Sequence, residues 1–276
     1  MTFSRPLAGS LALLIAAATA AHVPVAPTLN PSSLGTAPPQ SQVGGSTQEG
    51  LALFHKMQRA LGGADRIAAI HDFEQYVRAE SWNGNTGQSM GEVKKRTRWI
   101  QPNILRVDQV GPGSTYVLYF DGTSGWEIIP GTQKVVAIKG DELAFARSYI
   151  RGFRLNVWLA DRDARVRITT PSRNVVRLSD GELEHQSDIT LDSSSWLPIK
   201  TSGISLADPA HPISSDEVIT DWETVQGIRV PRRWTVYRGG VRVAAAIEAV
   251  ATINSGLKLA DIAKTPPDLT PELAAR

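Results

Sequence analysis

The residues closest to a metal-site pattern lie at the start of a predicted strand. His71 and Glu74 occupy the first and fourth positions of the zinc motif H-x-x-E-H, but Gln75 stands where the motif requires its second histidine. Because structural and catalytic zinc sites both need three or four protein ligands, this pair is too small a set. We therefore expect no metal site at these residues.

Catalysis by an activated nucleophile has no recognisable setting in the chain. The remaining histidines are scattered, and none stands beside a second histidine at ligand spacing. The sequence contains neither a G-x-S-x-G elbow nor a glycine-rich phosphate loop. A triad assembled from distant residues would leave no local motif. An exported hydrolase is therefore kept as the alternative function, although no catalytic residue and no cofactor are expected.

The apolar residues suggest a ligand-binding site more strongly than the polar residues do. Seven tryptophans lie mostly on predicted strands, where each either fills the core or lines a pocket for an apolar ligand. Their number on one sheet, beside an alanine-rich strand, favours a cavity for an apolar ligand. The residues expected to line it are Trp99, Tyr116, Leu118, Phe120, Trp126, Ile128, Phe153, Trp222, Trp234, Val243, Ala245, Ile247 and Ala249.

Basic residues gather in three places. One cluster is Lys94, Lys95, Arg96 and Arg98, another is Arg229, Arg232 and Arg233, and a third is Arg147, Arg151 and Arg154 on one face of a predicted helix. Such clusters are either solvated faces or contacts with anionic lipid head groups or an acidic partner. We expect the third to contact a head group or partner. Arg96 and Arg98 share a strand face with Glu92 and Lys94, and that face is predicted to meet water.

The composition is that of a soluble globular protein. The chain has 276 residues, of which 42% are hydrophobic and 20% charged, and its formal net charge is +2. This small charge gives no overall field for nucleic acid, so no nucleic-acid partner is expected. We expect a monomer.

The N-terminus has the pattern of an export signal. Arg5 precedes the apolar run Leu7–Ala18, and Ala18-Thr19-Ala20 matches a small-x-small cleavage site, so residues 1–20 are predicted to be a signal peptide cleaved after Ala20. The run is shorter than the roughly 20 residues of a membrane-spanning helix, which disfavours the alternative of an uncleaved anchor. The chain has no cysteine to acylate, and we expect an exported, periplasmic protein.

A proline-rich linker is predicted over residues 21–45, and helices and strands follow it. Ser46 and Glu49 have the spacing of a capping box, and the helix that they begin should end at Gly62-Gly63. Short helices are predicted over Ala64–Ile70 and from Asp141, with a break near Gly152. The strands predicted before the last hairpins are Asp72–Trp82, Glu92–Ile100, Ile104–Val110, Thr115–Asp121, Gly125–Ile129, Arg165–Thr170, Asn174–Ser179, Asp188–Asp192 and Leu197–Ile204.

The stretch Thr220–Asn254 contains three extended runs. Gln226-Gly227 and Gly239-Gly240 separate them, as tight hairpin turns would. In the last run, alternation predicts one dry face of a long antiparallel strand. The residues of that face are Val241, Val243, Ala245, Ile247, Ala249, Ala251 and Ile253. We predict an α+β fold: a single large curved antiparallel β-sheet, an unclosed or half β-barrel, with helices covering the concave face.

The order of these features resembles the LolA/LolB-like superfamily of exported lipoprotein-carrier domains. The matching pieces are GGADRIAAI after the first helix, YFDGTSGWEIIPG within the first five predicted strands, WLPIKTS, and DWETVQGIRVPRRWTVYRGG before the long strand. The resemblance implies an unclosed β-barrel wrapped around helices, a hydrophobic cavity for acyl chains, and neither cofactor nor catalysis. It assigns residues 46–266 to a lipid-binding domain and leaves 267–276 as a C-terminal tail.

The function expected from this resemblance is that of a periplasmic carrier or sensor. Its partners would be lipid or lipoprotein acyl chains, in outer-membrane lipoprotein sorting or envelope homeostasis. A membrane surface or an envelope protein is the further partner considered.

Overall fold

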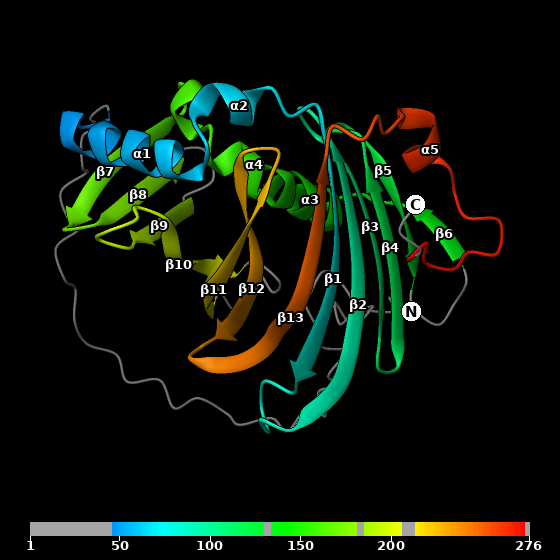
Figure 1. The fold of residues 1–276 in the computed structure, drawn as a ribbon. Coiled ribbons are helices and arrows are strands. Elements are labelled where there is room, and N and C mark those ends of the chain that lie inside the picture. The colour runs from blue at the N-terminus through cyan, green and yellow to red at the C-terminus, as the bar shows by residue number, and fades with distance from the viewer. Residues whose placement is uncertain (1–45, 130–133, 181–184, 206–212, 274–276) are drawn as a thin grey trace, which may run out of the picture.

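The computed structural model describes residues 46–129, 134–180, 185–205 and 213–273 (Figure 1). The predicted signal peptide and linker lie outside the described residues. Over the described part of the chain, the strands form one thirteen-stranded antiparallel sheet that curls without closing, which confirms the predicted α+β, unclosed-barrel fold.

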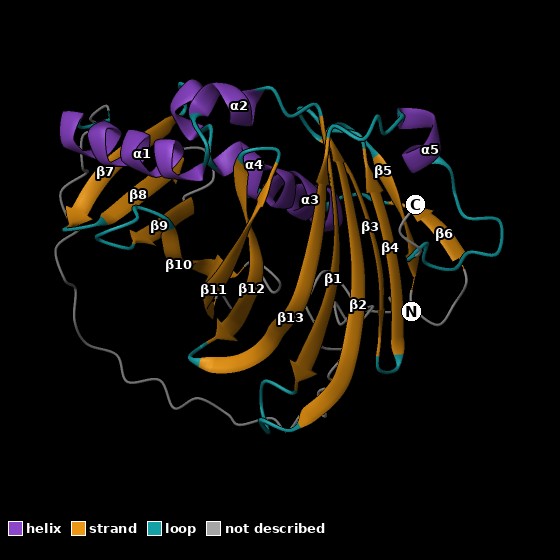
Figure 2. Cartoon of the chain, in the orientation of Figure 1, coloured by secondary structure: helices purple, strands orange, loops and turns teal. Residues whose placement is uncertain are grey.

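The helices fall before, between and after two groups of strands (Figure 2). They are α1 (Gln48–Leu61), α2 (Ala64–Ala68), α3 (Asp141–Arg151), α4 (Arg154–Val157) and α5 (Leu259–Ala263), with a 3-10 turn η1 (Ala160–Arg162). The first group of strands is β1 (Asp72–Trp82), β2 (Ser89–Ile100), β3 (Ile104–Gly111), β4 (Ser114–Phe120), β5 (Gly125–Ile129) and β6 (Lys134–Ala137). The second group is β7 (Val166–Ser172), β8 (Val175–Asp180), β9 (His185–Leu191), β10 (Pro198–Ser205), β11 (Ile213–Val225), β12 (Ile228–Arg238) and β13 (Val241–Ile253).

Two meanders join at the middle of the sheet. The strand order is β6-β5-β4-β3-β2-β1-β13-β12-β11-β10-β9-β8-β7, so the first strand of the chain pairs with the last. Phe73 on β1 lies opposite Ile253 on β13. The edges of the sheet are β6 and β7, and in Figure 2 they lie at opposite sides of the molecule.

The predicted hairpin turns are confirmed. Gln226 and Gly227 have φ angles of 50° and 81°, and Gly239 and Gly240 have φ angles of 54° and 79°. Positive φ at both central residues gives a two-residue turn the twist that antiparallel strands require. These turns set β11, β12 and β13 side by side.

The first helix begins one residue later than the sequence suggests. Thr47 is the N-cap, and its side chain accepts a hydrogen bond from the Gly50 N–H at 3.0 Å. Ser46 instead accepts from the Ile168 N–H of β7 through its Oγ at 2.9 Å. The prediction of Ser46 as the cap is therefore wrong, because this hydroxyl fixes the incoming chain to the sheet. The apolar stripe of α1, including Phe54 and Met57, packs into the main core.

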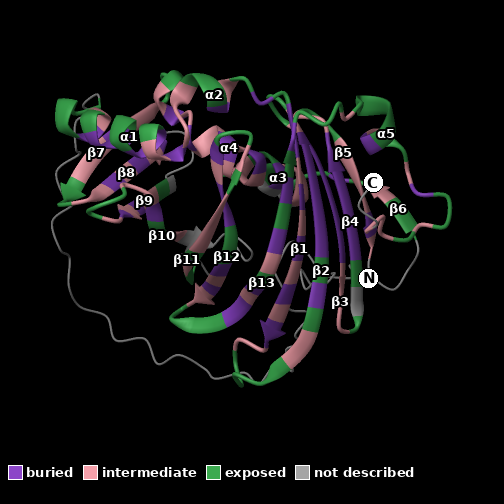
Figure 3. Ribbon diagram, in the orientation of Figure 1, coloured by how far each residue is buried: buried purple, intermediate pink, exposed green. Residues whose placement is uncertain are grey.

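The inner face of the sheet is covered by α3 and α4, which Figure 1 shows within its curl. Phe153, between the two helices, stacks on Trp99 of β2 with ring centroids 5.6 Å apart and meets Phe73 of β1 edge-on at 5.9 Å. The predicted break of the helical run at Gly152 is confirmed. Both faces of β4 are buried, as its sequence predicted, and β3 and β4 are among the strands drawn with long buried stretches in Figure 3.

Two β-bulges interrupt the alternation of β13. Ala246 and Glu248 pair with consecutive residues of β1, so Ile247 is left without a partner there. On the other side, Ala244 and Arg242 pair with consecutive residues of β12, which leaves out Val243. An extra residue in one strand shifts the faces of all residues beyond it. The prediction of one dry face from Val241 to Ile253 is therefore wrong: Ile247 is 44% exposed, whereas Ala244 and Ala246 are buried.

Part of the outer face of β2 and β3 is shielded from water. Arg96 and Arg98, predicted to be solvated, are buried, and so are Arg106 and Asp108 of β3. The C-terminal segment, from α5 to Glu272, covers them. The Arg106 guanidinium donates to the backbone oxygens of Ile262 and Lys264 at 3.3 and 2.6 Å.

One carboxylate lies at the centre of this buried cluster. Asp108 accepts from Arg98 Nη2 at 2.6 Å, from Arg106 Nε and Nη2 at 3.0 Å each, and from the Glu272 N–H at 3.0 Å. Glu272 also pairs with Arg98 at 3.0 Å. The described part of the predicted C-terminal tail thus lies against the sheet through charge-assisted hydrogen bonds.

Candidate functional site

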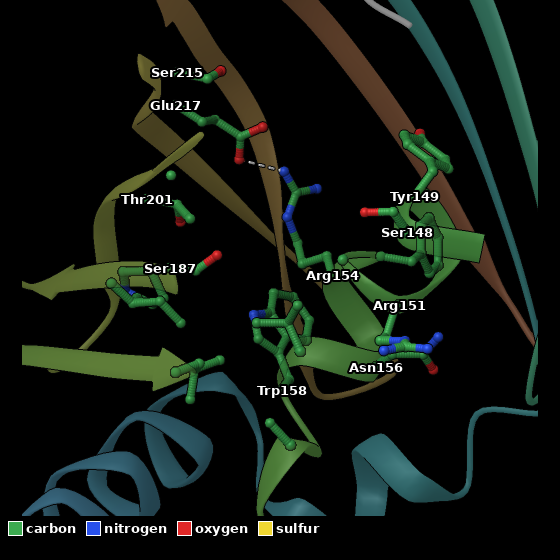
Figure 4. Close-up of a pocket in the computed structure, with 18 of the residues that line it drawn as sticks. Ser148, Tyr149, Arg151, Arg154, Asn156, Trp158, Ser187, Thr201, Ser215 and Glu217 are labelled. Atoms are coloured by element: carbon green, nitrogen blue, oxygen red, sulfur yellow. Dashed lines mark hydrogen bonds and ion pairs between the residues drawn. The ribbon is translucent and has the colours of Figure 1, made fainter. Parts of the chain in front are cut away.

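A pocket of about 530 Å³ lies between α3, α4 and the inner face of the sheet. We call it the α3–α4 pocket. Figure 4 shows Thr201, Ser187 and Ser215 on its strand wall, facing Ser148 and Tyr149 on the helix wall. The strand wall is built by β1, β2 and β7–β12, and the helix wall by α3, α4 and η1. The volume falls within the range of about 300–1,000 Å³ usual for small-molecule sites.

Apolar side chains form much of the pocket lining. They come from both walls and include three aromatic rings: Phe153, Val157, Trp158, Ala160, Val166, Leu178, Ile189, Ile219, Trp234 and Val236. The backbone of Trp158 is tied to α1, because its carbonyl oxygen accepts a hydrogen bond from Gln58 Nε2 at 2.9 Å. Its ring also lies 6.4 Å from that of Trp222. Such a lining suits an aliphatic chain and needs no directional contact with it.

Two ion pairs fasten the helix wall to the strand wall. Arg154 of α4 donates to Glu217 of β11 at 2.6 Å, drawn as a dashed line in Figure 4, and its guanidinium lies over the Trp234 ring at 5.4 Å. Arg151 of α3 donates to Asp180 of β8 at 2.7 Å. Both guanidinium groups are therefore neutralised by carboxylates across the pocket.

Arg238, at the end of β12, also lines the pocket, but its surroundings differ from those of Arg151 and Arg154. Its Nε is buried, and within the described residues no acceptor is bonded to it. No carboxylate of the described chain lies within ion-pair distance of its guanidinium. Burial lowers the pKa of Arg238, because the charged form loses water.

The structure brings part of the predicted cavity lining together. Phe153 and Trp234 line the α3–α4 pocket, and so do Arg151 and Arg154 of the predicted head-group cluster. Arg147 of the same cluster is exposed on α3 and does not line the pocket. The aromatic and apolar residues that instead pack in the main core around the helices are Trp99, Tyr116, Leu118, Phe120 and Trp222.

Trp126 and Ile128 do not face the inner side of the sheet. Trp126 lies opposite Tyr119 and Ile128 opposite Val117, on the face covered by the C-terminal segment. Trp126 donates its Nε1–H to the Ala263 backbone oxygen at 3.2 Å. Their prediction as partners of Tyr116 and Leu118 in one cavity is wrong, since alternation puts the two sets on opposite faces.

The alanine-rich strand does not border the α3–α4 pocket either. None of Val243, Ala245, Ile247 and Ala249 is among its described lining residues. Val243 and Ala249 belong to a second core cluster with Trp234, against which Trp222 packs. The small side chains on β13 thus pack with two tryptophans, Trp234 of β12 and Trp222 of β11.

Several lining residues were missed by the sequence reasoning. Gln75 and Thr97 lie opposite each other on β1 and β2, buried on the inner face. Trp158, Thr201 and Arg238 are also in the lining. A signal was available for the first two, because each is a polar residue at an inward position of an alternating strand, where a core residue would be apolar.

The residues with the partial zinc pattern lie apart from the pocket. His71 is exposed, and Glu74 on the outer face accepts from Arg96 Nε at 2.5 Å. In the described ranges, no group of three or more His, Cys, Asp or Glu side chains is arranged to hold a metal ion. The described helices include none that is long and apolar enough to cross a membrane.

Solved structures of known proteins share this arrangement of sheet and helices. A DUF1329 family protein from Desulfovibrio piger matches with a TM-score of 0.53 and 11% identity, over 78% of this chain and 98% of that one. A LolA superfamily protein from Nitrosomonas europaea matches with a TM-score of 0.52 and 10% identity, over 78% and 97%. The fold is LolA-like. The resemblance inferred from the motifs is thereby confirmed at the level of the fold, whereas no family model and no curated protein matches the sequence.

Proposed function

We propose that this protein is a periplasmic carrier or sensor that binds an acyl chain, of a lipid or a lipoprotein, in the α3–α4 pocket. The observation that carries the proposal is an apolar pocket of about 530 Å³ inside a LolA-like fold. Burial of each ligand methylene would contribute about 0.8 kcal/mol, so ten methylenes would suffice for useful affinity without a specific hydrogen bond.

The pocket volume suits one chain. At about 530 Å³ it falls within the range of about 300–1,000 Å³ in which small-molecule sites hold ligands of this size. The site would therefore hold one acyl chain of a larger cargo, or a whole single-chain lipid.

The periplasmic location is supported by the N-terminal sequence. Arg5, the apolar run Leu7–Ala18 and the small residues Ala18 and Ala20 have the pattern of a cleaved signal peptide. We infer a role in lipoprotein sorting or envelope homeostasis, with the lipid or lipoprotein as partner. The alternative of a hydrolase gains no support from the pocket, because its described lining contains no histidine to activate a serine.

The proposal can be tested with a fluorescent acyl probe and a matched pair of variants on β10. Thr201 lines the pocket, whereas its neighbour Lys200 points to the other face and pairs with Asp216 at 3.2 Å. Thr201→Trp should fill part of the pocket. Exclusion of three methylenes would weaken probe binding by about 2.4 kcal/mol, or about 60-fold.

The control Lys200→Trp adds the same ring outside the pocket and should bind the probe as the parent does. Both variants should keep the circular dichroism spectrum of the parent. A parent protein that binds no acyl probe would refute the proposed function. Equal affinity of Thr201→Trp and Lys200→Trp would refute the pocket as its site.

A further inference from the structure

A row of polar residues crosses the strand wall of the α3–α4 pocket. Arg238 on β12 lies opposite Ser215 on β11, and Ser215 lies opposite Gly203 on β10. A Cβ built on Gly203 would be 3.6 Å from Ser187 Oγ on β9, so Ser187 continues the row. All four residues line the pocket. The row therefore places one guanidinium and two hydroxyl groups along one wall, with a residue that has no side chain between the hydroxyls.

The cations that line the pocket differ in how their charge is compensated. Arg154 and Arg151 have carboxylate partners at 2.6 and 2.7 Å. Lys95 donates to Tyr149 Oη at 3.4 Å. Arg238 is half-buried, its buried Nε has no bonded acceptor among the described residues, and no described carboxylate pairs with it.

A guanidinium that has lost part of its water without gaining an anion is unfavourable, because nothing replaces the lost solvation. A ligand anion would supply that partner through two charge-assisted hydrogen bonds, the geometry in which Arg recognises carboxylates and phosphates. Ser215 and Ser187 can donate to further oxygens of the same group. Glu217 lies two residues from Ser215 in the same strand, but Arg154 already neutralises it, so it does not compete for Arg238.

We propose that Arg238, with Ser215 and Ser187, is a subsite for the anionic head of a single-chain amphiphile whose aliphatic chain occupies the apolar part of the pocket. The head is a carboxylate or a phosphate monoester. This inference rests on the proposed function and deepens it, since it selects the cargo by charge as well as by chain. It also moves the head-group contact from the helix arginines, which are neutralised, to Arg238 on β12.

The test compares three twelve-carbon ligands by isothermal titration: dodecanoate, dodecyl phosphate and dodecan-1-ol. The parent protein should bind one or both anions about 10- to 100-fold more tightly than the alcohol, as expected for a hydrogen bond to a charged group. Arg238→Gln should lose this preference and keep its affinity for the alcohol. Arg233→Gln, which removes an exposed charge from the same strand, should keep the preference.

The outcomes separate this inference from the proposed function. If the parent binds the alcohol and both anions equally, the anion subsite is refuted and the acyl pocket stands. If Arg238→Gln weakens the anions and the alcohol alike, Arg238 acts by packing and the subsite is also refuted. If the parent binds none of the three ligands, the proposed function fails as well. Preference for dodecyl phosphate over dodecanoate would identify a lipid phosphate as the head, and the reverse would identify a free fatty acid.

Discussion

Replacement of Asp108 tests how the outer face of the sheet is stabilised. The side chains of Asp108 and Arg106 are both 0% exposed, and that of Arg98 is 4% exposed. Asp108→Asn keeps the shape of the side chain and removes its charge, so two buried guanidinium groups lose their shared carboxylate. Removal of one partner from a buried ion pair destabilises a protein by about 3–5 kcal/mol. Glu272 still pairs with both arginines, so we expect the lower end, about 3 kcal/mol.

For a domain of this size, 1 kcal/mol shifts the melting temperature by about 2–4 °C, so Asp108→Asn should lower it by about 6–12 °C. Thermal and urea unfolding followed by circular dichroism measure the change. The control is Glu92→Gln, which breaks ion pairs of about 40% exposed side chains with Arg78 and Lys94. It should change the free energy of unfolding by less than about 1 kcal/mol.

A change of less than 1 kcal/mol for Asp108→Asn would refute the reasoning, because a buried carboxylate between two guanidinium groups could not then be essential to their burial. A second variant separates charge from packing. If Arg98 and Arg106 are changed to Met and Asp108 to Leu together, most of the stability should return, since apolar residues of similar volume can replace a buried ion cluster.

Two further predictions concern other parts of the fold. Gly50→Ala should lower the free energy of unfolding by about 1–3 kcal/mol, because its Cβ would lie 2.7 Å from the Ile168 backbone oxygen, whereas Gly152→Ala, whose nearest contact would be 3.5 Å, should not. Urea denaturation of the two variants decides this, and equal stability would contradict the close approach of α1 and β7. Hydrogen bonds from Arg165 hold the pKa of the Asp163 carboxyl at about 2, below its ordinary value of 3.8. This pair should therefore stabilise the folded state above pH 4 and lose that effect as the pH falls from 4 to 2, by less than about 1 kcal/mol because the pair is largely exposed. An acid-unfolding midpoint that Arg165→Met leaves unchanged would contradict the assignment.

The sequence predicted the elements where local chemistry decides them. Asp72–Trp82 and Gly125–Ile129 are strands with the predicted bounds; turn formers follow the first and flank the second. The Gly239-Gly240 turn follows from the φ angles that only such residues adopt readily. The bulge at Ile247 could not be predicted, because it depends on the register with β1, a strand from the other end of the chain.

Burial by segments distant in the sequence could not be predicted either, for the same reason. The alternation that placed Arg96 and Arg98 on one face was right, but nothing local shows that Glu272 returns to cover them. For the pocket, aromatic content identified Phe153 and Trp234. It misplaced Trp126, because an aromatic side chain suits either face of a sheet that is covered on both.

The pairing of β1 with β13 has a consequence for how the chain folds. Each meander consists of hairpins between consecutive strands, whereas the pairing of β1 with β13 joins residues far apart in the sequence. For example, the His71 N–H donates to Asn254 Oδ1, 183 positions later. A loop of this length closes late, and contacts of such sequence separation slow folding. While the chain is being made, β1 therefore presents an unpaired edge until the last strand arrives. During that interval, strand pairing with another copy competes with folding, and we expect association of nascent or truncated chains that lack β13.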